Sequence, residues 1–257
     1  MRKILLFILC FGCISPTLAK ICDSTSIVQS RNGILFLPNQ VQPFSGENLC
    51  IYENGQYQIQ GEYTDGLKDG EWVTWSENGI KKTELIYMLG SLKTKTVFSA
   101  EHYQKVLQIN YTNGNEVSKI FWIYFDNGIP EKEVGVVEDK RNGRYISWYD
   151  NGNKEYQGNF VDGVAQGVWT HWHKNGKKEE VVEMLNNERS GTSNQWDEDG
   201  LKLEDVGYKN GKLHGLWRKW HKNGQKKEID IMRKALRLDW RPVGTRMEKY
   251  MSKEVMN

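Results

Sequence analysis

Two histidines lie close together in the stretch GVWTHWHKNGKKEE, residues 167–180. His171 and His173 flank Trp172, so in a strand both imidazoles lie on one face, where they could bind a metal ion. His221 falls in the same place of a similar stretch, but strands spaced about 4.8 Å apart put it about 19 Å from His173. Ligands of one zinc ion each lie about 2 Å from it. We therefore predict no metal site and interpret these histidines as solvated residues of a sheet face.

Carboxylates are the next residues that could do chemistry. Glu71, Glu84 and Asp162 occupy repeated positions or turns, whereas a catalytic acid and base would stand apart from a repeat. The sequence also has no Gly-x-Ser-x-Gly motif and no Gly-rich phosphate loop. We predict a non-enzymatic protein with no catalytic residues and no cofactor.

The histidine stretch is one copy of a repeat. Glycines open successive copies at intervals of 24 residues, and a second glycine follows nine residues later, preceded by Asn in five of six copies. The unit from residue 119 lacks its first glycine, and a degenerate unit with a one-residue insertion fills the gap before it. We count eight units in the range 46–238, which begin near residues 46, 70, 94, 119, 143, 167, 191 and 215.

Each unit has the sequence pattern of a β-hairpin. Asn-Gly between aromatic and β-branched runs favours a two-residue type I′ turn, in which both central residues have φ > 0. A second turn, such as the one at residues 63–66, joins each unit to the next. One hairpin cannot bury its aromatic face alone, so neighbours must stack. We predict an all-β fold, an elongated twisted antiparallel sheet of about eight consecutive hairpins.

Large side chains fill three positions of the repeat, which lie two, five and seventeen residues after the first glycine. Positions two and five fall on opposite faces of a regular strand, so either a bulge intervenes or both faces are partly covered. We interpret most of these aromatic residues as core. Exposed members of the position-five column could instead contact a partner. The candidate contact residues are Trp148, Trp172, Trp196 and Trp220.

Lysines recur eleven residues after the first glycine and could form an anion-binding stripe. The alternative is charge pairing across strands of a wet face, which nearby acids such as Glu155 and Glu179 favour. The chain has 35 Lys and Arg against 33 Asp and Glu, and without Arg2 and Lys3 it has 33 of each. Nucleic-acid binding usually needs a basic excess, so we predict no nucleic-acid partner.

The two ends differ from the repeats. Residues 1–19 have a basic start, an apolar run and a small-residue cleavage site, which predicts a secretory signal. Acylation of Cys13 in a lipoprotein is the alternative. Cys22 and Cys50 then remain as a possible disulfide or as two thiols. Residues 20–45 are predicted to be an N-terminal cap, and residues 239–257 a C-terminal cap of helical character.

The repeat resembles a known family. Its pattern, G-x-W/Y-x-x-W/Y-x-x-N-G-x-K followed by Y-x-x-G-x-x-x-G, is similar to the MORN repeat variant of bacterial YwqK-type proteins, which are antitoxin or immunity partners. The likeness covers residues 46 to about 240. It implies an elongated sheet of hairpins and a toxin as partner, inhibited by steric occlusion.

Two functions are compatible with these observations. The first is an exported binding protein of the periplasm or cell envelope that presents a β surface to another protein. Such a protein could also associate peripherally with the envelope. The second is an envelope scaffold or glycan-binding protein, in which the tryptophan column stacks on sugars. The sequence favours the first.

Overall fold

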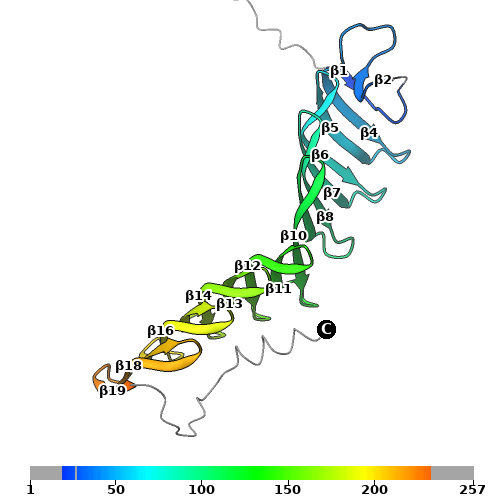
Figure 1. The fold of residues 1–257 in the computed structure, drawn as a ribbon. Coiled ribbons are helices and arrows are strands. Elements are labelled where there is room, and N and C mark those ends of the chain that lie inside the picture. Colours follow the sequence, from blue (N-terminus) through cyan, green and yellow to red (C-terminus); the bar gives the residue numbers. More distant parts are fainter. Residues whose placement is uncertain (1–18, 27, 233–257) are drawn as a thin grey trace, which may run out of the picture. The chain divides into compact units, whose positions relative to one another are not determined.

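The computed structural model describes residues 19–26 and 28–232 (Figure 1). These residues form strands and no helix, so none of them belongs to a helix that could cross a membrane. The prediction of an all-β fold is confirmed. The expected signal segment, apart from Ala19, and the expected helical C-terminal cap lie outside the described residues.

The described chain divides into two compact units, an N-terminal unit of residues 19–142 and a C-terminal unit of residues 143–232. The strands of the N-terminal unit are β1 (Ala19–Ile21), β2 (Gln29–Arg31), β3 (Ile34–Phe36), β4 (Gly46–Ile51), β5 (Tyr57–Thr64), β6 (Leu67–Trp75), β7 (Lys81–Met88), β8 (Ser91–Phe98), β9 (Lys105–Thr112), β10 (Asn115–Tyr124) and β11 (Pro130–Val137). Strand β12 (Lys140–Trp148) begins before the boundary and continues past it. It is followed by β13 (Lys154–Val161), β14 (Val164–Trp172), β15 (Lys178–Leu185), β16 (Glu188–Trp196), β17 (Lys202–Lys209), β18 (Lys212–Trp220) and β19 (Lys226–Met232).

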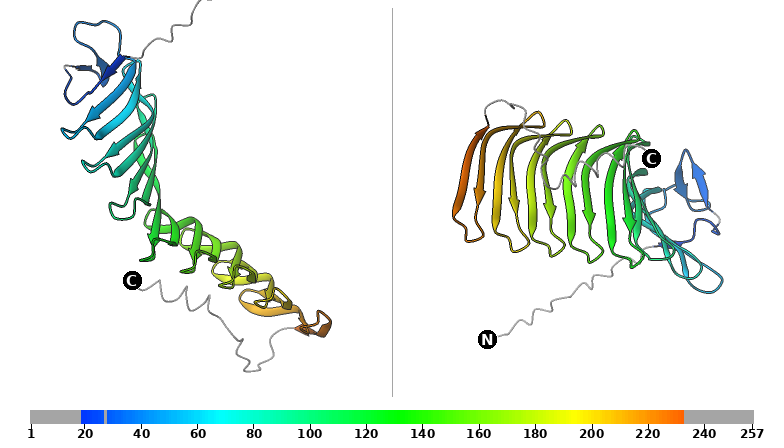
Figure 2. Two further views of the ribbon diagram at one scale, coloured as in Figure 1. Left: turned by 180° about the vertical axis from the view of Figure 1, so that it is seen from behind. Right: turned by 90° about the horizontal axis from the view of Figure 1, so that it is seen from below.

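Consecutive strands pair with one another. All strands except β2 and β3 belong to one sheet of 17 strands. From β4 to β11, and again from β12 to β19, each strand is antiparallel to the next. Figure 2 shows the strands of the C-terminal unit as a regular row. The prediction of consecutive hairpins is therefore confirmed.

The type I′ turns lie at the opposite ends of the hairpins from those predicted. Asp65 and Gly66 have φ of 49° and 76°, and they connect the paired residues Thr64 and Leu67. The same two-residue turn with two positive φ angles occurs at the other junctions between repeats, which are 89–90, 113–114, 138–139, 162–163, 186–187 and 210–211. The type I′ geometry that we predicted for the Asn-Gly turns is thus found at the junctions between repeats.

The Asn-Gly turns have three-residue loops instead. In the loop between Ser76 and Ile80, Gly79 has φ of 79° whereas Asn78 is not among the residues with positive φ. The amide of Gly79 donates to the carbonyl of Ser76 at 2.8 Å, which closes a tight turn before the left-handed glycine. This arrangement matches the three-residue hairpin loop that ends in a glycine bulge. The type I′ prediction for Asn-Gly is wrong because only the glycine needs the left-handed region.

In three of these turns the asparagine serves as a connector between repeats. Asn175 Nδ2 donates to the carbonyl of Glu198 in the next repeat at 2.7 Å, while its Oδ1 accepts from the amide of Lys177 at 3.0 Å. Asn54 and Asn151 make the same cross-repeat bond at 2.8 Å. The carboxamide is needed because it can donate and accept at once.

Replacing Asn175 with Asp should therefore weaken the contact between two repeats. A carboxylate accepts the bond within the turn but faces the carbonyl of Glu198 without a proton, so we expect a loss of about 1–2 kcal/mol in the free energy of unfolding. Asn223→Asp is the matched control, because Asn223 Nδ2 binds Gln225 in its own turn. Urea denaturation measures both changes, and equal losses in the two variants would contradict the connector role.

The two faces of the sheet are distinct. Positions two and seventeen of the repeat lie on a core face, where Trp72, Trp169 and Phe160 are almost completely buried. Neighbouring rings on this face meet edge to face, as Phe160 and Trp169 do at 5.1 Å between centroids. Position five lies on the opposite face, where Trp172 is half-buried. Both faces are thus partly covered.

Glycines on the core face make room for the indole rings. A Cβ on Gly61 would lie 2.2 Å from an atom of the Trp72 ring, and one on Gly158 would lie 2.1 Å from the Trp169 ring. Where the next repeat has Ser193 in place of the aromatic residue, the glycine is replaced by Val182. At this pair of strands the larger valine compensates for the smaller serine, as close packing requires.

The segment before the first repeat packs against its core. Leu35 and Phe44 are buried against Tyr63 and Trp72. Backbone bonds at 2.9 Å and 2.7 Å tie Leu35 and Phe44 to Gly66, in the first turn between repeats. These contacts cover the aromatic face that the first hairpin would otherwise expose.

A disulfide joins Cys22 to Cys50, with 4.8 Å between their Cα atoms. The bond closes a loop with a sequence separation of 28 residues. Loop-closure entropy for this length corresponds to about 3–4 kcal/mol. Replacing both cysteines with serine should lower the unfolding free energy of the N-terminal unit by about this amount, and a loss below about 1 kcal/mol would contradict the argument. Thermal denaturation with and without reductant gives the comparison.

The degenerate third repeat is also a hairpin. Strands β8 and β9 pair in antiparallel register, and the amide of Ser99 donates to the carbonyl of Gln104 at 2.7 Å. This loop is one residue longer than the one between Ser76 and Ile80, and Tyr103 takes the positive φ of 55° that glycine has elsewhere. The inserted residue is therefore accommodated in the turn.

Candidate binding surface

Tryptophans and lysines alternate in one row across the C-terminal unit. The pairs of residues directly opposite each other on adjacent strands are Trp148 and Lys154, Trp172 and Lys178, Trp196 and Lys202, and Trp220 and Lys226. We call these eight residues the Trp–Lys ladder and their side of the sheet the ladder face. All four predicted contact tryptophans belong to it, and all four are half-buried.

Ammonium groups lie over the indole rings within the ladder. Lys154 Nζ is 5.7 Å from the ring centroid of Trp172, and Lys202 Nζ is 4.6 Å from that of Trp220. Each lysine is one repeat before the tryptophan whose ring it contacts. Such cation–π contacts stabilise exposed sites by about 0.5–1 kcal/mol each.

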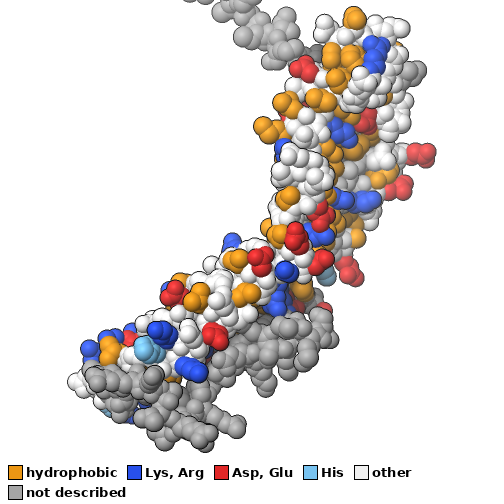
Figure 3. All heavy atoms as spheres, viewed as in Figure 1, with side chains coloured by type: hydrophobic (Ala, Val, Ile, Leu, Met, Phe, Trp, Pro, Cys, Tyr) orange, Lys and Arg blue, Asp and Glu red, His pale blue; other side chains and the backbone are white. Residues whose placement is uncertain are grey.

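The predicted charge pairing across strands occurs at Lys81, whose Nζ lies 3.8 Å from Glu71 Oε1 on the adjacent strand, but two of the ladder lysines have other partners. Lys202 Nζ binds Asp205 Oδ2 at 3.1 Å, three residues along the same strand, and Arg218 binds the same carboxylate at 3.3 Å. Lys154 Nζ binds the neutral amide of Gln157 at 2.8 Å. The cross-strand neighbour of each ladder lysine is a tryptophan, so charge along the row is only partly neutralised. Figure 3 shows one face of the molecule, on which acidic and basic side chains are interspersed.

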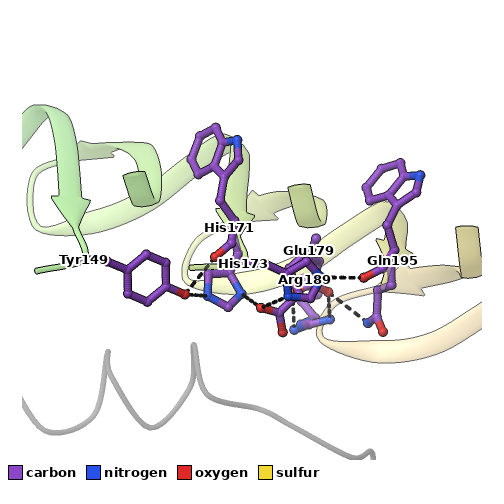
Figure 4. A network of polar contacts seen from close by, with 9 residues as sticks. Tyr149, His171, His173, Glu179, Arg189 and Gln195 are labelled. Carbon is purple, nitrogen blue, oxygen red and sulfur yellow. Dashed lines mark hydrogen bonds and ion pairs between the residues drawn. The ribbon is translucent and has the colours of Figure 1, made fainter. Parts of the chain in front are cut away.

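His171 and His173 both contact the carboxylate of Glu179 (Figure 4). Glu179 Oε2 lies 3.2 Å from His171 Nδ1 and 3.4 Å from His173 Nδ1. His171 is 4% exposed and stacks on Tyr156, with 4.2 Å between ring centroids. The prediction of solvated histidines is therefore wrong for His171, because its strand turns this position toward the core face.

The Nε2 atom of each imidazole contacts a neighbouring repeat. His173 Nε2 donates to the carbonyl of Trp196 at 2.9 Å, and His171 Nε2 lies 3.4 Å from the hydroxyl of Tyr149. That hydroxyl donates to the carbonyl of Trp172 at 2.8 Å. Among the described residues, no group of three or more His, Cys, Asp or Glu side chains has the arrangement of a metal site. The two histidines act here as struts between successive repeats.

A second polar cluster is buried one strand further on. Arg189 forms a bidentate pair with Glu180, at 2.5 and 3.0 Å, and Ser193 Oγ donates to Glu180 Oε1 at 2.6 Å. Burial opposes the charge of the guanidinium, but attraction and hydrogen bonds to Glu180 and Tyr208 together outweigh it and raise the pKa of Arg189. Burial raises the pKa of Tyr208, whose ring lies 5.4 Å from Arg189.

Sequence reasoning missed this cluster, although one signal was present. Ser193 stands where neighbouring repeats have aromatic residues, at position two. A small polar residue in a buried aromatic column needs hydrogen-bonding partners, and the only way to supply them is from adjacent strands. Glu180 on β15 accepts from Ser193, and Arg189 at the start of β16 in turn pairs with Glu180.

The ladder face of the N-terminal unit has a different character. An open pocket of about 590 Å³ there is lined by Trp75 and Lys81, the residues at ladder positions, together with several carboxylates. The carboxylates are those of Glu47, Glu62, Asp69 and Glu71. Acidic side chains thus outnumber basic ones around this pocket, in contrast to the row of lysines in the C-terminal unit.

Comparison with known proteins identifies the repeat. The MORN repeat variant family matches residues 141–162 and 213–231. These two segments are therefore similar to MORN repeats, and the chain is a β-repeat protein. No curated protein matches the sequence.

Two solved structures show limited likeness. The crystal structure of TarM is 14% identical with a TM-score of 0.24, and the match covers 43% of this chain and 21% of that one. The crystal structure of TcdB2-TccC3-Cdc42 is 11% identical with a TM-score of 0.15, and the match covers 72% of this chain and 13% of that one. Each match covers only a small part of the other protein.

Proposed function

We propose that this chain is a non-enzymatic binding protein that presents the ladder face of its C-terminal unit to another protein. The observation that carries the proposal is the placement of Trp148, Trp172, Trp196 and Trp220. They lie half-buried on the face opposite the core, while other aromatic columns fill the core itself. Tryptophan is enriched among the residues that dominate binding energy in protein interfaces.

The polar clusters on the core face support a structural role and not a catalytic one. Glu179 is held by two imidazoles, and Glu180 by Arg189 and Ser193. Each carboxylate is thus committed to contacts that connect neighbouring strands. A catalytic acid or base would need a cleft in which a substrate could reach it.

The partner we propose is a toxin, which the chain would neutralise by steric occlusion. The resemblance to antitoxin and immunity proteins of the YwqK type motivates this choice. The compartment we propose is the periplasm or cell envelope, because residues 1–19 have the sequence of a secretory signal. The Cys22–Cys50 disulfide supports an oxidising compartment.

Affinity capture of the tagged chain from the native envelope fraction tests this function. Mass spectrometry should find a protein in stoichiometric amount, and the double variant Trp172→Ala/Trp196→Ala should lose it. Lys209→Ala, exposed at the far end of β17, is the control that should retain it. Circular dichroism must show that the double variant stays folded. Recovery of glycan alone, or equal capture by all three proteins, would contradict the proposal.

A further inference from the structure

We infer that the part of the partner bound by the Trp–Lys ladder is an acidic polyproline II segment with a carboxylate at every third residue. The inference rests on the proposed function and specifies the chemistry of its partner. Three features of the ladder carry it, which are the spacing of the tryptophans, the placement of the lysines between them and the fixed orientation of the rings.

The spacing of the tryptophans matches the polyproline II helix. Successive ladder tryptophans lie two strands apart. With about 4.8 Å between strands, the row has a period of about 9.6 Å. Polyproline II has three residues per turn and rises about 3.1 Å per residue, so its period is about 9.3 Å. Over the three intervals from Trp148 to Trp220 the mismatch reaches only about 0.9 Å.

Other extended ligands match less well. A β-strand repeats every two residues, about 6.7 Å, so its same-face side chains fall out of step with the rings at once. Two turns of an α-helix span about 10.8 Å, and the mismatch grows to about 3.6 Å over the same three intervals. A polyproline II segment also has no internal hydrogen bonds, so it can follow the twist of the sheet.

The lysines require carboxylates at the same period. One ammonium group lies between each pair of tryptophans, and Lys178 and Lys226 are exposed. Lys202 and Arg218 share the single carboxylate of Asp205, so these three groups retain one positive charge. A ligand with one acid per turn places each carboxylate beside an ammonium group while its prolines pack on the rings. This satisfies both components of the ladder.

Preorganisation makes such binding favourable. The cation–π contacts at 5.7 and 4.6 Å hold the rings of Trp172 and Trp220 against neighbouring lysines. Polyproline II is already populated in the free ligand, so little conformational entropy is lost when it docks on an aromatic surface.

Isothermal titration calorimetry with synthetic peptides tests the inference on the full chain. The probe is four repeats of Glu-Pro-Pro, and the controls are four repeats of Lys-Pro-Pro, which reverses the charge, and of Glu-Gly-Ser, which retains the acid spacing without the helix. We expect the first to bind at least about tenfold more tightly than either control. Raising NaCl from about 50 to about 500 mM should weaken it at least about tenfold, because exposed charges are screened.

The ladder variants locate the binding and separate the two proposals. Trp172→Ala/Trp196→Ala should weaken binding of the Glu-Pro-Pro peptide at least about tenfold, with Lys209→Ala unchanged. Absence of binding, equal binding of the Glu-Gly-Ser peptide, or equal binding by the double variant would overturn the inference. If the intact chain still captures a protein through Trp172 and Trp196 and the acidic peptide does not displace it, the inference fails and the proposed function stands. If no protein is captured either, both fail.

Discussion

Glu180→Gln should destabilise the C-terminal unit by about 3–5 kcal/mol. The variant removes the charge that balances Arg189, and the side chains of Glu180 and Arg189 are only 9% and 11% exposed. An uncompensated guanidinium then stays buried beside Tyr208, away from water. Urea denaturation, followed by amide hydrogen exchange of β15 and β16, measures the loss.

Two further variants separate charge from packing at this cluster. Glu183→Gln changes an exposed carboxylate of the same strand and should alter the unfolding free energy by less than about 0.5 kcal/mol. The double variant Glu180→Leu/Arg189→Leu should recover most of the loss, because an apolar pair leaves no buried charge. An effect of Glu180→Gln as small as that of Glu183→Gln would show that Arg189 is not held by this carboxylate.

Gly158→Val should cost about 3 kcal/mol or more in the free energy of unfolding. The added Cβ would overlap the ring of Trp169, which is itself fixed between Tyr145 and Phe160 at centroid distances of 5.8 and 5.1 Å. The ring has no space to move on this buried face. Asn159→Ala, at an exposed neighbouring position, should change stability by less than about 0.5 kcal/mol.

A double-mutant cycle tests why glycine and tryptophan occur together. Gly158→Val/Trp169→Ser reproduces the Val182 and Ser193 combination of the next repeat. We expect a favourable coupling of at least about 1 kcal/mol between the two substitutions, since valine fills the space that the indole leaves. Additive losses in the cycle would contradict volume exchange between neighbouring repeats.

The repeat made the fold predictable, but not the details of its turns. Glycine spacing and the aromatic columns were sufficient to predict consecutive antiparallel hairpins. The type I′ assignment failed because Asn-Gly and Asp-Gly have equal local preference for that turn, and the dipeptide does not show whether two or three residues separate the paired strand ends. Bonds between repeats, such as that of Asn175 to Glu198, were missed as well. A hydrogen bond to the next repeat is a tertiary property that a local pattern does not contain.

The ladder and the buried clusters could also be predicted only in part from the sequence. The four tryptophans could be named from their column, but the sequence left open whether a bulge intervenes between positions two and five or both faces are partly covered. Their lysine neighbours could not be named, because a β-bulge at each of these strand pairs sets the cross-strand register, as between His171 and Trp172. The burial of His171 was missed for a related reason. Its face depends on which side of the sheet packs as core.

The central claim is that the ladder face binds a protein, and the affinity of the captured partner tests it most directly. Surface plasmon resonance would compare the intact chain with Trp172→Ala/Trp196→Ala and Lys209→Ala. Each ladder tryptophan is expected to contribute more than about 1.4 kcal/mol, so the double variant should bind at least about 100-fold more weakly. The Lys209→Ala variant should bind as the intact chain does. Equal affinity of the double variant, with its fold intact, would contradict the account.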